Sequence, residues 1–225
     1  MKLPPTPTPL RKPARLLTLL ASLSLAWGLG PAQAVAFGSL NVTPRGAQNL
    51  NLETGYTDLP QGGTATDAKG GLTLTAQKMQ LRPGERLVAQ GATLKTRQGG
   101  TLNAAQLTYD LKSGTVTATG GVTYSDARFQ GLQAPGVVLY VSSGFVVASG
   151  GVKTTAPAMT GAALAFDPQT MQAVVSGPFD LQTRLGRSVG KAGERLLLTF
   201  AGNALTNSTA RPTADDLARF GPYLK

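Results

Sequence analysis

The residues whose chemistry could be catalytic are four aspartates that recur near expected turns: Asp110, Asp126, Asp167 and Asp180. A pair of carboxylates at the right separation performs glycoside hydrolysis. However, Asp110 and Asp167 stand beside expected hairpin loops, where aspartate is favoured because it accepts hydrogen bonds from turn N–H groups. We therefore predict no catalytic residues, and a polysaccharide-active β-helix enzyme is the alternative.

A glycine-rich segment at residues 186–192 resembles a phosphate-binding loop. It is one residue short between its glycines, and Ala192 takes the place of the Ser or Thr that must hold magnesium, so a polar turn is the alternative. The chain contains neither His nor Cys. These absences exclude a Ser-His-Asp triad, an imidazole metal site and disulfides. We expect no enzyme activity, no metal site and no cofactor.

The N-terminus has the features of a secretory signal. Basic residues at positions 11, 12 and 15 precede an apolar run over 16–27, which is followed by Ala32-Gln33-Ala34. This order predicts a signal peptide over residues 1–34 that is cleaved after Ala34. The apolar run is shorter than the roughly 20 residues of a membrane span. A retained membrane anchor is the alternative.

The charges of the chain are scattered. The first 34 residues hold four of the 21 basic side chains and none of the 11 acidic ones, so the exported part carries 17 against 11, a net charge of +6. No run of Lys or Arg is present in that part. This distribution favours a solvated surface with anionic neighbours, and we predict no nucleic-acid partner.

Glycines recur with a fixed period of 30 residues. The two series are Gly84, Gly114 and Gly144, and, seven residues later, Gly91, Gly121 and Gly151. A period of this length predicts stacked supersecondary units. We therefore expect the function to lie in a long repeated surface.

The clearest unit covers residues 102–131. Apolar and polar residues alternate on both sides of a break at 112–114, which predicts two half-buried strands joined by a tight turn with a left-handed glycine. The same pattern recurs at 132–161 and in the unit before. A shorter unit over 164–179 lacks the turn glycine and is expected to be terminal. Further strands are predicted near 40–42, 50–52, 72–74 and 196–200.

The glycine pairs interrupt the second strand of each unit. A glycine inside a strand marks a bulge or a bend, and bends at one level in successive strands would crease the whole sheet. The predicted fold is therefore an open-ended trough of stacked hairpins that folds its apolar face against itself. A barrel or sandwich with bulges is the alternative. At the C-terminus, Thr213 is expected to cap a short helix that either plugs one mouth of the trough or frays.

The apolar stripe of these strands consists mostly of Val, Leu and Ala, with Tyr109, Tyr124, Phe129 and Phe166 spaced among them. Part of it must be the hydrophobic core, and part could face a channel for a chain-like ligand. Each buried methylene contributes about 0.8 kcal/mol, so a trough that covers even one acyl chain could hold a lipid.

Residues 105–124 read A-x-L-x-Y-D-x-x-S-G-x-V-x-A-T-G-G-V-x-Y, and residues 148–153 repeat the end of this pattern. It resembles the periplasmic lipopolysaccharide-transport proteins of the LptA/OstA-like type, over about residues 72–179. The resemblance implies an all-β fold, an antiparallel β-jelly-roll or β-taco with an open-ended apolar groove, here over residues 35–210, followed by a short helix or tail over 211–225. Members of that family stack end to end and carry lipopolysaccharide acyl chains within the groove.

For this chain, the resemblance implies a periplasmic protein that binds and transports lipid. Its expected partners are lipopolysaccharide or another envelope lipid, further copies of itself, and transport components of the inner and outer membranes. The residues that would line the groove are Leu107, Tyr109, Val116, Val122, Tyr124, Val137, Leu139, Val146 and Val152. A membrane-anchored LptC-like component and a structural repeat protein without lipid are the alternatives.

Overall fold

The computed structural model describes residues 35–37, 40–184 and 186–224, so the predicted signal peptide and its cleavage site lie outside the described residues. Within this part the chain forms one antiparallel sheet and one short helix. The first strands are β1 (Val35–Phe37), β2 (Leu40–Pro44), β3 (Asn49–Asn51), β4 (Tyr56–Leu59), β5 (Gly63–Asp67), β6 (Leu72–Arg82), β7 (Arg86–Thr96), β8 (Thr101–Asp110) and β9 (Thr115–Ser125). They are followed by β10 (Leu132–Tyr140), β11 (Phe145–Thr154), β12 (Ala158–Asp167), β13 (Gln172–Ser176), β14 (Phe179–Thr183), β15 (Gly186–Gly190), β16 (Arg195–Ala201), β17 (Ala204–Thr209) and α1 (Ala214–Ala218).

The repeated hairpins predicted from the glycine period are present. The turns at 83–85, 111–114 and 141–144 join β6 to β7, β8 to β9 and β10 to β11. The predicted turn glycines all have positive φ, as a left-handed turn residue requires. In the shorter last unit, the turn at 168–171 places Met171 at φ 56°, which is uncommon for a residue with a side chain.

The predicted crease is confirmed at the level of the second glycine series. The pairing register shifts between Asn103 and Gln106 in β8 and between Ser149 and Val152 in β11. Gly121 and Gly151 lie at this level with φ of 73° and 98°. A Cβ added to either would meet nothing within 4 Å, so glycine is needed here for its backbone conformation and not for space.

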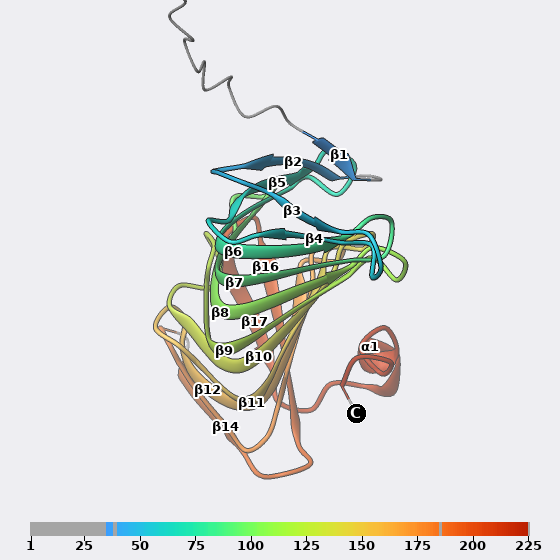
Figure 1. Cartoon of the computed structure of the whole chain (residues 1–225). Helices are drawn as coiled ribbons and strands as arrows, with labels where there is room; N and C mark the ends of the chain where they lie inside the picture. The colour runs from blue at the N-terminus through green and yellow to red at the C-terminus, as the bar shows by residue number, and fades with distance from the viewer. Residues whose placement is uncertain (1–34, 38–39, 185, 225) are drawn as a thin grey trace, which may run out of the picture. The chain divides into compact units, whose positions relative to one another are not determined.

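The crease divides the sheet into two parts, and Figure 1 shows the strands stacked from β2 at one end to β14 at the other, bending on the way. Half-sheet A consists of residues 40–44, 63–67, 72–76, 92–96, 101–104, 122–125, 132–134, 152–154, 158–161, 179–183 and 186–190. Half-sheet B consists of residues 49–51, 56–59, 78–82, 86–90, 106–110, 115–119, 136–140, 145–149, 163–167, 172–176, 195–201 and 204–209. Their inward side chains form one continuous hydrophobic core.

The C-terminal segment covers the outer face of half-sheet B and does not plug the trough. One row of outward-facing residues runs across neighbouring strands of half-sheet B. It begins with threonines at positions 108 and 117 and continues with apolar residues at 138, 147, 165 and 174. Phe220 and Leu224 pack on this apolar part in a second buried cluster. The helix begins at the predicted cap, because the Thr213 hydroxyl accepts a hydrogen bond from the N–H of Asp216.

No helix in the described ranges is long and apolar enough to cross a membrane.

Candidate lipid-binding groove

The structure brings the nine predicted groove residues together from both sides of the crease. Leu107, Tyr109, Val116, Val137, Leu139 and Val146 lie in half-sheet B, and Val122, Tyr124 and Val152 lie in half-sheet A. All nine belong to the core or pack against it, and Val146 is half-buried. The two-residue period along each strand therefore predicted their inward direction correctly. Whether they bind lipid stays a prediction.

Between β2 and β5 to β9, side chains of both half-sheets leave little free space. A cavity in this interior, lined by residues such as Leu74, Leu107 and Val116, has a volume of about 10 Å³. That volume is comparable to the space that one water needs, and far below that of an acyl chain. A lipid would have to part the two half-sheets and replace the contacts between them.

A buried hydrogen bond joins the half-sheets across the trough near its first strands. Tyr109 in half-sheet B donates from its hydroxyl to a carboxylate oxygen of Asp67 in half-sheet A, over 2.6 Å. The other carboxylate oxygen of Asp67 accepts from the N–H groups of Lys69 and Gly70. Burial, followed by the hydrogen bond and charge of Asp67, raises the pKa of the Tyr109 hydroxyl far above its ordinary value.

The loop at 126–130 makes a second connection across the trough. Phe129 inserts from half-sheet A and packs edge-on against Phe166 and Phe200 of half-sheet B. The guanidinium of Arg128 lies 4.6 Å from the ring centroid of Phe166 and is paired with the buried carboxylate of Asp126. This loop thus closes the trough with both an aromatic and a charged group.

Asp126 gathers several donors of this loop. One of its oxygens accepts from the Arg128 side chain and from the Tyr124 hydroxyl, and the other accepts from two backbone N–H groups. Burial, followed by the charge and hydrogen bond of Asp126, raises the pKa of the Tyr124 hydroxyl. The sequence had singled out Asp126 as a candidate catalytic carboxylate near an expected turn, whereas in the structure it binds the N–H groups and the arginine of its own loop.

Between the two connections, the turns of the half-sheets leave an opening, the lateral mouth, with a volume of about 240 Å³. The turns of half-sheet A that line it carry Lys69 and Arg97, and half-sheet B contributes Leu139, Val146 and Phe166 together with the turn at 141–144. Sequence reasoning missed Lys69 and Arg97. The sequence feature that could have indicated this pair is a basic residue in each of two successive turns on the same side of the sheet.

Each of the four candidate acids is bound by partners close to it in the sequence. Asp110 and Asp167 accept hydrogen bonds from backbone N–H groups of their own turns, Asp126 does so at 126–129, and Asp180 is paired with Arg187. The turn role predicted for Asp110 and Asp167 is therefore confirmed, and Asp126 has the same role at 126–129. The segment that resembled a phosphate loop forms strand β15 and the turn after it, without the helix that such a loop needs.

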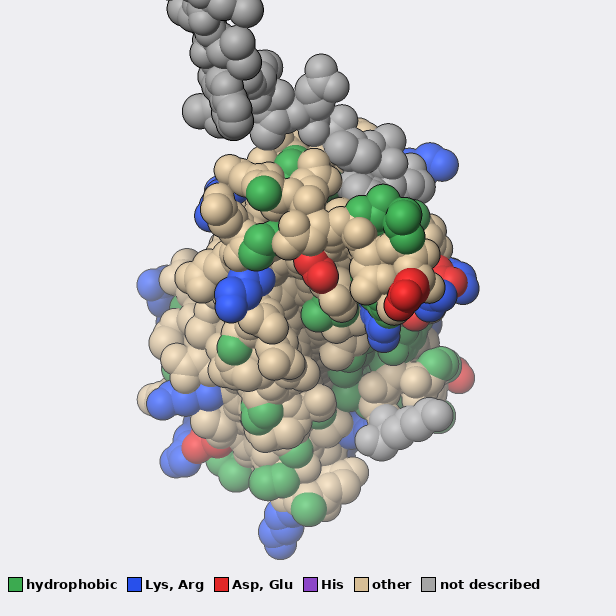
Figure 2. Space-filling model, in the orientation of Figure 1, with side chains coloured by type: hydrophobic (Ala, Val, Ile, Leu, Met, Phe, Trp, Pro, Cys, Tyr) green, Lys and Arg blue, Asp and Glu red, His purple; other side chains and the backbone are tan. Residues whose placement is uncertain are grey.

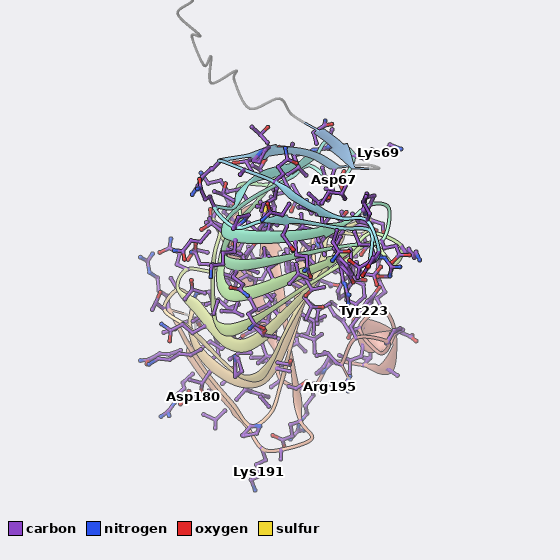
Figure 3. All side chains as sticks on the ribbon, viewed as in Figure 1. Asp67, Lys69, Asp180, Lys191, Arg195 and Tyr223 are labelled. Carbon is purple, nitrogen blue, oxygen red and sulfur yellow. The ribbon has the colours of Figure 1, made fainter. Side chains whose placement is uncertain are left out.

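Exposed large hydrophobic side chains occur at the two ends of the array. Leu50 in β3 and Leu52 directly after it are exposed at one end, and Val189 in β15 is exposed at the other. Within the described residues, β3 pairs with β4 alone and β15 with β14 alone. Each end therefore offers an unpaired strand edge beside apolar side chains. In Figure 3, Asp67 and Lys69 mark one end of the sheet, and Asp180 and Lys191 the other.

Comparison with known proteins found no matching family model and no matching curated protein. Among solved structures, the chain is similar to the crystal structure of LptH, described as the LptA homologous periplasmic component of the conserved lipopolysaccharide transport device from Pseudomonas aeruginosa. The identity is 13%, the match covers 49% of this chain and 81% of that one, and the TM-score is 0.44.

Proposed function

We propose that this protein is a periplasmic lipid carrier that shelters acyl chains between its half-sheets and passes them along the array. The observation that supports it is a single apolar lining shared by the two half-sheets, which meet along the crease. At the rims away from the crease, the Tyr109–Asp67 hydrogen bond and the contact of Arg128 with Phe166 join the half-sheets. The cargo would be lipopolysaccharide or another envelope lipid. The carrier would work with inner- and outer-membrane components.

The packed interior is compatible with this proposal on energetic grounds. An acyl chain that enters between the half-sheets exchanges protein–protein contacts for protein–lipid contacts, so the apolar lining stays out of water. Each methylene removed from water contributes about 0.8 kcal/mol, and a chain of about ten methylenes thus gains about 8 kcal/mol. The opposing cost is the loss of the few polar contacts at the rims, at about 1–3 kcal/mol each.

Lipid uptake by the purified protein tests the proposal. We expect native mass spectrometry to detect bound lipid, and a fluorescent fatty acid to bind in competition with it. Val122→Trp should reduce uptake because it enlarges a buried side chain of the lining. Thr123→Trp, on the exposed outer face of the same strand, is the matched control and should not reduce it. A wild-type protein that carries no lipid and takes up none would refute the proposal.

We further propose that copies of the chain associate end to end. The unpaired edges of β3 and β15, beside Leu50 and Val189, suit the pairing of one copy with the next. Leu50→Lys and Val189→Lys should each shift the mass measured by light scattering toward the monomer. Thr117→Lys, exposed in the middle of the array, is the control. Monomeric wild-type protein at every accessible concentration would contradict end-to-end association.

A structural repeat protein without cargo is the second candidate, and the filled interior favours it. The uptake experiment separates the two candidates, because a scaffold binds no acyl probe.

The anchored alternative depends on residues outside the described part, and N-terminal sequencing of the exported protein decides it: cleavage after Ala34 leaves a free carrier.

A further inference from the structure

The lateral mouth combines cationic and apolar side chains in one opening. Lys69 and Arg97 come from two neighbouring turns of half-sheet A, and Leu139, Val146 and Phe166 come from half-sheet B. No acidic side chain is among the residues that line this mouth in the described part of the chain. An opening that combines two cations with apolar side chains and with the two serines of the 141–144 turn suits an amphiphile with an anionic head.

The side chains of Lys69 and Arg97 are both available to bind an anionic head group. Among the described residues, neither Lys69 nor Arg97 takes part in an ion pair. Asp67 lies next to them, but its oxygens are occupied by the Tyr109 hydroxyl and two backbone N–H groups. An incoming anion therefore faces no competition from a carboxylate already bound to these side chains.

Arg97 is also held in place. One guanidinium nitrogen donates to the backbone carbonyls of Ala68 and Lys69, over 3.1 and 3.4 Å. The side chain lies so close to Gly71 that a Cβ there would be 2.5 Å from its Nε. Those two bonds use one of the two terminal nitrogens of the guanidinium, so the other terminal nitrogen can still donate to an oxygen of an anion. Fixing the group beforehand reduces the entropy lost when an anion binds.

We propose that the lateral mouth recognises the phosphate of a phosphate-bearing acyl lipid, with Lys69 and Arg97 on the phosphate and the first methylenes of the chain against Leu139, Val146 and Phe166. This inference rests on the proposed function. The volume of about 240 Å³ lies below that of pockets that enclose whole ligands, so the mouth holds a head and the start of a chain. The remainder of the chain would lie between the half-sheets.

The test compares three probes on the purified protein: oleoyl lysophosphatidic acid, monooleoylglycerol with the same chain but no phosphate, and inorganic phosphate. Lys69→Gln/Arg97→Gln should weaken binding of the lysophosphatidic acid by about tenfold or more, because hydrogen bonds to charged groups of this kind correspond to at least that factor. Binding of monooleoylglycerol should change little. Both residues are exposed, so the fold should survive.

Lys95→Gln/Lys153→Gln is the matched control. It removes the same charge from exposed positions on the outer face of half-sheet A and should leave lysophosphatidic acid binding unchanged. An equal loss of lysophosphatidic acid binding in the control variant would show that only the net charge of the protein matters, and it would refute the proposed head-group site. Equal binding of inorganic phosphate and of the lipid would overturn it as well. If neither oleoyl probe binds the wild type, the proposed function itself fails. If both bind equally well and the Lys69→Gln/Arg97→Gln variant changes neither, the head-group site alone fails.

Discussion

The Tyr109 hydroxyl and the Asp67 carboxylate, 42 positions apart in the chain, form a 2.6 Å hydrogen bond that connects the two half-sheets across the trough. Both residues are buried. Their strands, β8 and β5, are not neighbours in the sheet, so this contact exists only because the sheet is creased. It therefore reports whether the half-sheets are closed.

Tyr109→Phe should destabilise the folded protein by about 1–3 kcal/mol, because it leaves the buried Asp67 oxygen without its side-chain donor. Urea unfolding measures this change. Tyr56→Phe is the control, since its hydroxyl accepts a hydrogen bond from Arg86 at the exposed surface and its loss should have little effect. A Tyr109→Phe protein as stable as the wild type would show that the bond does not hold the half-sheets together.

Alkaline pH should open the fold through two tyrosines. The folded-state pKa of Tyr109 and of Tyr124 is raised above the ordinary value of about 10, mainly by burial. Their contribution to stability is therefore complete below about pH 10 and is lost as the pH rises above that value, because the unfolded chain then releases these protons and the folded chain does not. Stability should fall more gently with pH in Tyr109→Phe and Tyr124→Phe.

The measurement is the tyrosinate absorbance during a pH titration, followed together with circular dichroism. Difference spectra between the wild type and each Phe variant assign the signal to one residue. Ionisation of Tyr109 or Tyr124 near pH 10 while the sheet remains intact would contradict the prediction.

The periodic features of the fold were predictable from the sequence because they are local. Alternation around Leu107 and Val116 indicates which side chains point inward, and glycines such as Gly114 and Gly121 indicate turns and bends. A scattered distribution of charge was also predicted, and Figure 2 shows basic side chains scattered over the face in view and not gathered in one stripe.

Contacts between distant segments were not predictable in this way. Asp67 and Tyr109 have no sequence relationship that signals their pairing, and the turns that carry Lys69 and Arg97 become neighbours only in the sheet. The outer cover was missed for a different reason. Val147 and Val174 interrupt the polar outer row, and alternation alone does not say that Phe220 packs on them.

The crease should depend on the backbone conformation of its glycines. Gly151→Ala should cost about 1–2 kcal/mol, because φ at this position is 98° and a Cβ is strained there although space is available. Gly136→Ala is the matched control on the adjacent strand: its φ is not positive, and an added Cβ would have no heavy atom closer than 3.8 Å. Urea unfolding should find Gly136→Ala unchanged or slightly more stable. Equal effects of both substitutions would show that the crease does not rely on Gly151.

Arg128 should contribute far more to the free energy of unfolding than Arg187, which forms a similar ion pair with an aspartate at the surface. Its side chain and that of Asp126 are 9% and 1% exposed, whereas those of Arg187 and Asp180 are 65% and 39% exposed. Arg128→Leu leaves a buried carboxylate without its counter-charge and should cost about 3 kcal/mol or more. Arg187→Leu should change stability little, since solvent already screens that pair.

A double variant separates the charge from the packing of Arg128. Asp126→Asn added to Arg128→Leu removes the uncompensated charge, so part of the lost stability should return, as a thermodynamic cycle in urea would measure. The remaining loss then reflects the contact of Arg128 with Phe166 across the trough. If Asp126→Asn restored nothing, the ion pair would not be what closes this loop, and closure would have to be assigned to Phe129 alone.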